Sequence, residues 1–283
     1  MKSLLPVLFF VLSFCTLSVA YPQTNACLPG NLRCEYLVKP LGVDESTPRL
    51  SWLINDNRYG AIQQAYLIIA GTDSLSVKNG KGNCWDSKRI ESDRMLVTYA
   101  GIKLEPFTKY FWRVQVWDKD GVPSEPVMTS FETGMMGIEN WQGNWISDGH
   151  DKNVKEAPYF RKEFKVSGKI KAARAYIAVA GLYELYLNGQ KVGDHRLDPM
   201  YTRYDRRNLY VSYDITEQLQ SGRNAVGVLL GNGWYNHQST AVWYFDLAPW
   251  RNRPAFCMDI RIVYEDGSEE TVATDNSFKY SLS

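Results

Sequence analysis

Short alternations of apolar and polar residues, separated by Gly, Asn, Asp and Pro, run along most of this chain. In "KYFWRVQVWDKDG", Tyr110, Trp112, Val114 and Val116 fall on one face of an extended strand, because successive side chains point to opposite sides. The dipeptide Asp120-Gly121 then favours a tight hairpin turn. No long stretch has apolar residues at helical spacing, so the sequence predicts an all-β protein.

A length of 283 residues predicts more than one domain. Gly, Asn and Asp accumulate in "GMMGIENWQGNWISDG", where the strand pattern lapses, and we expect the domain boundary there. We expect a fibronectin type III-like sandwich over residues 31–136, because Leu104-x-Pro106-x-Thr108-x-Tyr110 resembles a tyrosine corner. Residues 141–283 predict a jelly-roll β-sandwich of seven or eight strands, with hairpin turns at Asn188-Gly189 and Asp266-Gly267.

Residues 1–20 have the features of a secretory signal peptide, with a basic start, an apolar run and small residues before a cut at Tyr21. An uncleaved anchor or a lipoprotein signal is less favoured, because the run is short and Cys15 follows the bulky Phe14. We therefore expect a secreted or periplasmic protein. Removing Lys2 with the leader leaves 31 basic and 31 acidic residues. This balance argues against nucleic acid or an anionic membrane as a partner.

Four cysteines remain after the leader, and export would permit disulfides between them. Cys27 and Cys34 are near enough in sequence to close a small loop, although sequence leaves the connectivity open. The chain has no C-x-x-C pair, so we do not expect a structural zinc site.

The common catalytic motifs are missing, since the chain contains no G-x-S-x-G, H-E-x-x-H or phosphate-binding glycine loop. A triad built on His195 and Asp198 has no supporting motif. We therefore assign no catalytic residue.

Glu184 is the one carboxylate inside an apolar strand, "GLYELYLNG". Alternation divides the residues of this stretch between two faces. The core face carries Ile177, Val179, Tyr183, Leu185 and Leu187. The opposite face carries Tyr176, Ala178 and Glu184. An ion pair with an arginine of "YTRYDRRN" is the favoured interpretation, and a hydrogen bond to a sugar hydroxyl is the second. Catalysis with Asp194 or Asp198 is the least favoured, because glycoside cleavage needs two suitably spaced carboxylates.

The segment "GNGWYNHQSTAVWYFDLAPWRNRP" concentrates aromatic and amide side chains. Aromatic faces stack on the CH-rich faces of sugars, while amides bond hydroxyl groups. A long loop that anchors itself or docks on another domain explains the composition equally well. The candidate carbohydrate-binding residues are Glu184, Asn188, Trp234, Tyr235, Asn236, Trp243 and Trp250.

Two longer stretches carry a resemblance. "LRCEYLVKPLGVDESTPRLSWLI" resembles the opening of bacterial α-L-rhamnosidases, and the segment from "GLYELYLNGQ" to "LLGNGWY" resembles their N-terminal β-domain. The resemblance covers the chain from about Leu32 to its end. It implies the non-catalytic N-terminal portion of a secreted glycoside hydrolase, which serves as a scaffold and a carbohydrate-binding region.

In that family the catalytic acids belong to an (α/α)6 barrel, which this sequence does not contain. The resemblance therefore implies two partners, a rhamnose-containing glycan and the barrel of the parent chain. Some related β-domains bind rhamnose through calcium; Asn188, Asp194 and Asn236 are candidate ligands, although turn roles are favoured for them, and no other cofactor is expected. An autonomous carbohydrate-binding module and a cell-surface protein-interaction module remain as alternatives.

Overall fold

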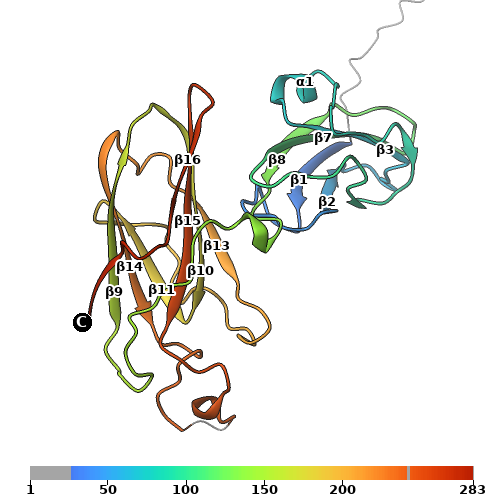
Figure 1. Ribbon diagram of the computed structural model, residues 1–283. Helices are drawn as coiled ribbons and strands as arrows, with labels where there is room; N and C mark the ends of the chain where they lie inside the picture. The colour runs from blue at the N-terminus through green and yellow to red at the C-terminus, as the bar shows by residue number, and fades with distance from the viewer. Residues whose placement is uncertain (1–26, 241–242, 283) are drawn as a thin grey trace, which may run out of the picture.

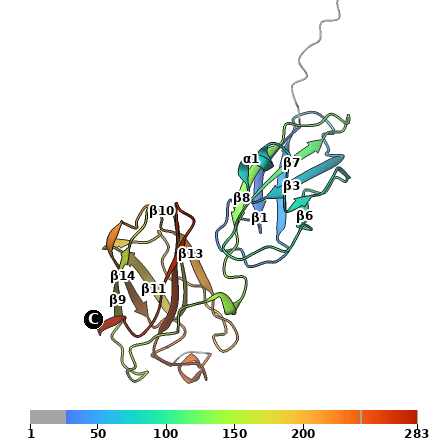
Figure 2. The same cartoon turned by 45° about the horizontal axis from the view of Figure 1, so that its top comes forward.

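The computed structural model describes residues 27–240 and 243–282, and the expected signal peptide and its cleavage site lie outside them. The chain forms two β-sandwiches, which lie beside each other and are joined by one connecting segment (Figure 1, Figure 2). The first sandwich consists of β1 (Leu28–Cys34), β2 (Arg49–Asn55), β3 (Ala65–Gly71), α1 (Ser74–Lys78), β4 (Trp85–Asp86), β5 (Ile90–Glu91), β6 (Leu96–Thr98), β7 (Lys109–Trp117) and β8 (Val127–Glu132). After η1 (Ile138–Asn140), the second sandwich consists of β9 (Pro158–Val166), β10 (Ile170–Ala180), β11 (Leu182–Leu187), β12 (Gln190–Lys191), β13 (Tyr210–Asp214), β14 (Gly222–Gly231), η2 (Phe245–Leu247), β15 (Ala255–Tyr264), β16 (Glu269–Ala273) and β17 (Lys279–Leu282).

The first sandwich packs the sheet β1-β2-β6 against the sheet β4-β3-β7-β8, with β5 paired to β3. Trp52 and Trp112 are fully buried between the two sheets. The Tyr110 hydroxyl accepts a hydrogen bond from the backbone N–H of Glu105 at 2.8 Å, and its ring stacks on Phe131. This is the tyrosine corner that the sequence predicted.

One short helix, α1, interrupts the β-pattern, and the sequence analysis did not predict it. The Asp73 side chain accepts from the backbone N–H of Ser76 at 2.7 Å, which caps the helix, and Val77 is buried. Five residues are too few for a helical periodicity to stand out against the surrounding strands.

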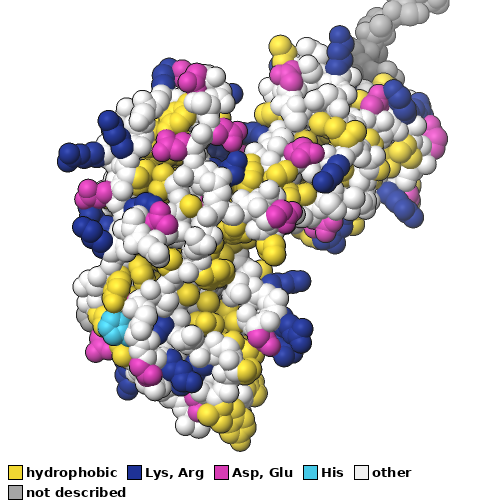
Figure 3. All heavy atoms as spheres, in the orientation of Figure 1, with side chains coloured by type: hydrophobic (Ala, Val, Ile, Leu, Met, Phe, Trp, Pro, Cys, Tyr) yellow, Lys and Arg dark blue, Asp and Glu magenta, His cyan; other side chains and the backbone are white. Residues whose placement is uncertain are grey.

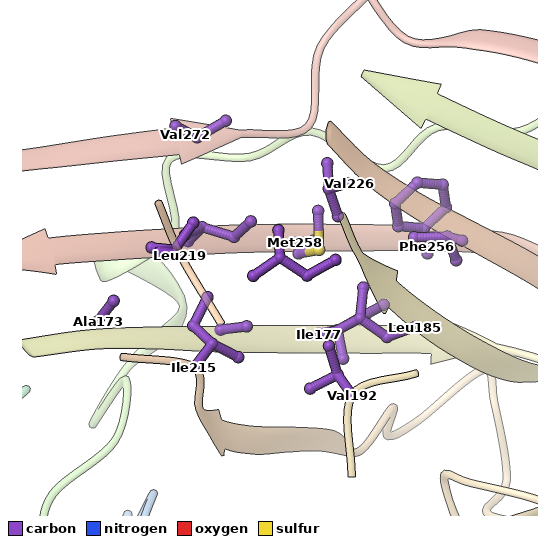
Figure 4. Close-up of a cluster of buried hydrophobic side chains, with 14 of the residues drawn as sticks. Ala173, Ile177, Leu185, Val192, Ile215, Leu219, Val226, Phe256, Met258 and Val272 are labelled. Atoms are coloured by element: carbon purple, nitrogen blue, oxygen red, sulfur yellow. The ribbon is translucent and has the colours of Figure 1, made fainter. Parts of the chain in front are cut away.

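The second sandwich packs the sheet β13-β10-β15-β16 against the sheet β12-β11-β14-β9-β17. Apolar side chains from both sheets fill the space between them (Figure 4). The chain crosses from one sheet to the other at Gly181, where φ is +127° and a Cβ would lie 2.5 Å from the Gly231 carbonyl oxygen. The stretch that the sequence presents as one broken strand is therefore two strands in opposite sheets.

The strand β10 is buried on both faces from Ala175 to Ala180, which the alternation did not predict. Tyr176 and Ala178 were expected on the open face, yet both are buried. The ring of Tyr176 packs edge-on against Phe107 of the first sandwich, with centroids 5.5 Å apart. The first sandwich thus covers part of the outer face of this sheet.

All four cysteines of the described residues are free and buried. Cys27 directly precedes β1 and Cys34 is its last residue, so this extended strand holds their Cα atoms well beyond the roughly 7 Å limit for a disulfide. The small disulfide loop considered from the sequence is therefore not formed. Burial raises the pKa of the Cys34 thiol to about 12. In residues 27–240 and 243–282, no helix has the length and apolar character needed to cross a bilayer.

Candidate functional site

Glu184 stands on the outer face of β11, as alternation predicted, but with other partners than expected. Its Oε2 accepts from the Tyr186 hydroxyl at 2.6 Å, and its Oε1 accepts from Lys191 Nζ at 2.9 Å and from Arg196 at 3.3 Å. The expected arginine partner from residues 201–208 was wrong, because the hairpin between β11 and β12 brings Lys191 to the same face. The hydrogen bonds from Tyr186 and Lys191 lower the pKa of Glu184. A general acid needs a raised pKa instead.

Asn188 occupies the turn after β11 and uses its side chain within the fold. Its backbone has φ of +51°, followed by +80° at Gly189, as a type I′ turn requires. The side chain donates to Gln218 O and Asn224 Oδ1 and accepts from the backbone N–H of Ala225. Asn188 therefore ties the hairpin to the neighbouring loop.

The three candidate calcium ligands do not come together. Strands β11 and β14 are antiparallel, and Leu182 pairs with Gly231. Asn188 and Asn236 consequently follow opposite ends of this pair, and the Asp194 side chain is fully exposed. No cluster of three or more His, Cys, Asp or Glu side chains suited to a metal occurs in the described part of the chain.

At the end of the second sandwich, two loops enclose a pocket of about 360 Å³. The loop after β12 returns to the sheet, where the backbone N–H of Tyr183 donates to Asp198 O at 3.1 Å. This pairing brings the next residues of that loop against the loop after β14. The lining residues, which we call the aromatic pocket, are Leu182, Leu197, Pro199, Tyr201, Tyr204, Gly233, Trp234 and His237.

Trp234 lines this pocket and is 44% exposed. The ring stacks on His237, with centroids 5.5 Å apart and planes inclined by 12°, and it contacts Phe245 and Tyr201. Gly233 makes the close approach possible: its φ is +50°, and a Cβ would lie 2.9 Å from Leu182 Cγ. One face of Trp234 is thus supported, with the ring held in a fixed orientation.

The other predicted aromatic residues lie around the pocket rather than in its lining. The Tyr235 ring packs against Tyr204 with centroids 5.2 Å apart, and burial raises its pKa. Trp250 packs behind Phe245, whereas Trp243 is 74% exposed at the rim. The sequence analysis missed Tyr201, Tyr204 and His237 as pocket residues, although the aromatic spacing in "PMYTRY" was an available signal.

The loop that carries Trp234 is anchored by a buried ion pair. Arg253 donates from both Nε and Nη2 to the Asp148 carboxylate, and both side chains are almost fully buried. Arg253 also donates to the carbonyl oxygens of Val154 and Glu156, and Asn236 donates to that of Lys152 at 2.9 Å. The loop therefore anchors itself through Asn236 and Arg253, as considered from the sequence, while the Trp234 side chain stays partly exposed.

Both halves of the chain match known family models. Residues 29–137 match the Rha78A-like N-terminal immunoglobulin domain, and residues 168–283 match the alpha-L-rhamnosidase N-terminal domain. An alpha-L-rhamnosidase of Formosa agariphila is 32% identical over 279 residues, which cover 86% of this chain and 28% of that protein. The chain thus spans less than a third of this curated relative.

Solved structures agree over both sandwiches. The alpha-L-rhamnosidase from Dictyoglumus thermophilum matches with a TM-score of 0.84 and 36% identity, over 91% of this chain and 30% of that one. The alpha-L-rhamnosidase from Aspergillus terreus matches with a TM-score of 0.78 and 28% identity, over the same shares. The chain belongs to the α-L-rhamnosidase family, of which it contains the N-terminal immunoglobulin-like domain and the following N-terminal β-sandwich domain.

Proposed function

We propose that this chain is the non-catalytic N-terminal portion of a secreted α-L-rhamnosidase and contacts rhamnose-containing glycans through the aromatic pocket. The half-exposed, supported ring of Trp234 is the observation that carries the proposal. A pyranose has a CH-rich face, which stacks on such a ring, and the pocket volume falls within the range of small-ligand sites.

The polar groups of the pocket suit a neutral sugar. His237 and the Tyr201 hydroxyl supply hydrogen-bonding groups beside the ring, and the lining contains neither a carboxylate nor a lysine or arginine. Such a lining favours hydroxyl groups over charged substituents.

Isothermal titration of the purified chain with L-rhamnose, with and without calcium, tests this function. We expect weak, calcium-independent binding that Trp234→Ala reduces at least tenfold. Trp243→Ala is the matched control, because Trp243 lies outside the pocket lining. Equal affinity for the wild type and Trp234→Ala would remove the pocket from the proposal.

We further propose that the chain alone does not hydrolyse glycosides. The purified chain should release no aglycone from an aryl α-L-rhamnoside, even at the high protein concentrations used for calorimetric titration. Turnover at an enzymatic rate would contradict this proposal, and its loss in Glu184→Gln would restore the catalytic interpretation of Glu184.

A protein-docking role is the second candidate, and the rim of the pocket favours it. Leu197, Met200, Trp243 and Leu247 are each about three-quarters exposed. Exposed apolar side chains gathered on one surface are typical of protein contacts, and hydrophobic side chains gather at this end of the second sandwich (Figure 3). A docking role predicts a protein partner that binds this chain with the same affinity in the presence and absence of L-rhamnose. Competition between the sugar and the partner would count against it.

The secreted location rests on residues 1–20 and is likewise a proposal. Expression in a bacterium with an intact secretion pathway should give a mature protein that begins at Tyr21. Amino-terminal sequencing of the exported product checks this, and a retained Met1 would contradict it.

A further inference from the structure

A second groove lies where the two sandwiches meet, and it shares no lining residue with the aromatic pocket. It has a volume of about 500 Å³, and hydrophobic side chains extend from this junction down the face of the second sandwich (Figure 3). Residues from both sandwiches and from the connecting segment form what we call the junction groove: Asp44, Met135, Gly137, Ile138, Trp141, Gly143, Trp145, Ala178, Asn208, Tyr210 and Cys257.

Two tryptophans of the connecting segment stand in this groove on a fixed backbone. Trp141 meets the ring of Tyr210 edge-on, with centroids 5.6 Å apart, and Trp145 is 48% exposed. The backbone N–H groups of Gln142 and Gly143 each donate to the buried Asp259 carboxylate at 2.8 Å. The backbone of the segment is therefore held against β15 before any ligand arrives.

The polar side of the groove is also fixed, by contacts between the sandwiches. The Tyr210 hydroxyl accepts from the backbone N–H of Met135 at 3.1 Å and donates to Asp44 Oδ1 at 2.8 Å. The backbone N–H of Met136 donates to the same oxygen at 2.9 Å. Among the hydrogen bonds of the described residues, none reaches Asp44 Oδ2, so this oxygen can accept from a ligand.

We propose that the junction groove binds one neutral pyranose residue of a glycan, as a second carbohydrate site independent of the aromatic pocket. The Trp145 face would stack on the sugar ring, and Asp44 Oδ2 would accept hydrogen bonds from its hydroxyl groups. This proposal shares with the proposed function the premise that the chain meets rhamnose-containing glycans.

Charge selects among the sugars that this groove can hold. Among the described residues, Asp44 is the one charged member of the lining, which contains no lysine or arginine. A uronic acid would bring a second carboxylate next to Asp44 without a balancing cation, which is unfavourable. The groove therefore favours a neutral or deoxy sugar over an anionic one.

A ligand in the groove would also brace the junction, because its two walls belong to different sandwiches. Asp44 comes from the first sandwich and Tyr210 from the second. A sugar that contacts both would bind only the docked arrangement, and it would stabilise that arrangement by mass action.

Two-dimensional ¹H–¹⁵N spectra of the whole chain, titrated with methyl α-L-rhamnopyranoside, test the proposal. The indole N–H signal of Trp145, assigned by its loss in Trp145→Phe, should shift with sugar concentration. D-glucuronate should leave this signal in place at the same concentrations. An unmoved Trp145 signal at saturating rhamnoside, or an equal response to glucuronate, would overturn the proposal.

Calorimetric titration of variants separates the two sites. Trp145→Ala should remove one of two binding events and leave the Trp234-dependent one, whereas Trp145→Phe should keep the affinity of the groove within about threefold, since a stacking face remains. Binding that Trp234→Ala abolishes completely would overturn the groove and leave the proposed function standing. Binding that survives Trp234→Ala but is lost in Trp145→Ala would support the groove and contradict the pocket.

Discussion

The guanidinium of Arg174, on β10, forms a two-bond ion pair with the carboxylate of Glu132, on β8 of the other sandwich. Nε lies 2.7 Å from Oε1, and Nη2 lies 3.0 Å from Oε2. Both side chains are largely buried, and Arg261 stacks over the ring of Phe107 nearby, at 3.6 Å. The two sandwiches are thus joined by a specific buried interface in addition to the connecting segment.

Breaking the ion pair between Arg174 and Glu132 should lower the stability of the folded protein. We expect Glu132→Ala to lower the free energy of unfolding, but by less than the about 3–5 kcal/mol typical of a broken buried pair, because Arg174 keeps its ion pair with the half-exposed Asp214, whose Oδ1 lies 2.9 Å from Nη1. Urea denaturation followed by circular dichroism measures the loss. Glu163→Ala is the control: its pair with Arg161 is more than half exposed, so its loss should change stability little. Equal losses in the two variants would contradict a structural role for the buried pair.

The sequence was sufficient to predict the local structure of most strands. Alternation placed Tyr183, Leu185 and Leu187 in the core and Glu184 outside it, and the Asn188-Gly189 turn is formed as expected. Strand alternation and turn type depend on residues that are close together in the sequence, so both can be predicted from the sequence alone.

What the sequence did not predict depends on contacts between distant segments. Tyr176 obeys the same alternation as Glu184, yet Phe107 of the other sandwich covers it. In the same way, Tyr201 reaches Trp234 only because Asp198 pairs with Tyr183. Strand periodicity contains no information about which loops meet, so Trp234 was predicted as a site residue while its neighbours in the pocket were not.

The tyrosine corner should be energetically important for the first sandwich. Tyr110→Phe removes the hydroxyl that accepts from the Glu105 backbone and leaves that donor unsatisfied, which costs about 1–3 kcal/mol. Urea denaturation measures this loss: the midpoint of unfolding should fall, while the dependence of the unfolding free energy on urea concentration stays unchanged. Tyr59→Phe provides the comparison, since the Tyr59 side chain is fully exposed and should lose almost nothing.

The aromatic pocket should depend on Gly233 more than on other glycines with a similar backbone. Gly233→Ala combines the left-handed strain, about 1–2 kcal/mol, with a contact of 2.9 Å to Leu182. Gly189→Ala has positive φ as well, but its Cβ would meet nothing within 4 Å. We expect both variants to be less stable and only Gly233→Ala to lose L-rhamnose affinity in calorimetric titration. If both variants bound rhamnose like the wild type, the pocket would not be the binding site.

Acid stability should depend on the pair between Asp275 and Lys162. Lys162 Nζ lies 2.8 Å from Asp275 Oδ2, and this bond, together with bonds from Ser277, lowers the pKa of Asp275 to about 2 from its usual 3.8. Because the folded-state pKa is the lower one, the stabilisation is fully present above about pH 4 and is lost as the pH falls toward 2. Asp275→Asn should therefore reduce the free energy of unfolding near neutral pH, and this difference should shrink to zero in acid.

The same pair gives an internal control through a double-mutant cycle. With Lys162→Met as the background, Asp275→Asn should change stability less, and with a weaker pH dependence, because the partner that lowers the pKa of Asp275 is gone. Thermal unfolding of the wild type, the two single variants and the double variant between about pH 2 and pH 7 measures the size of the Asp275→Asn effect and its pH dependence. The pH dependence follows from the protons that are taken up on unfolding. An Asp275→Asn effect that stays constant across this range would show that the carboxylate stabilises the fold through Ser277 and local geometry rather than through the charge of Lys162.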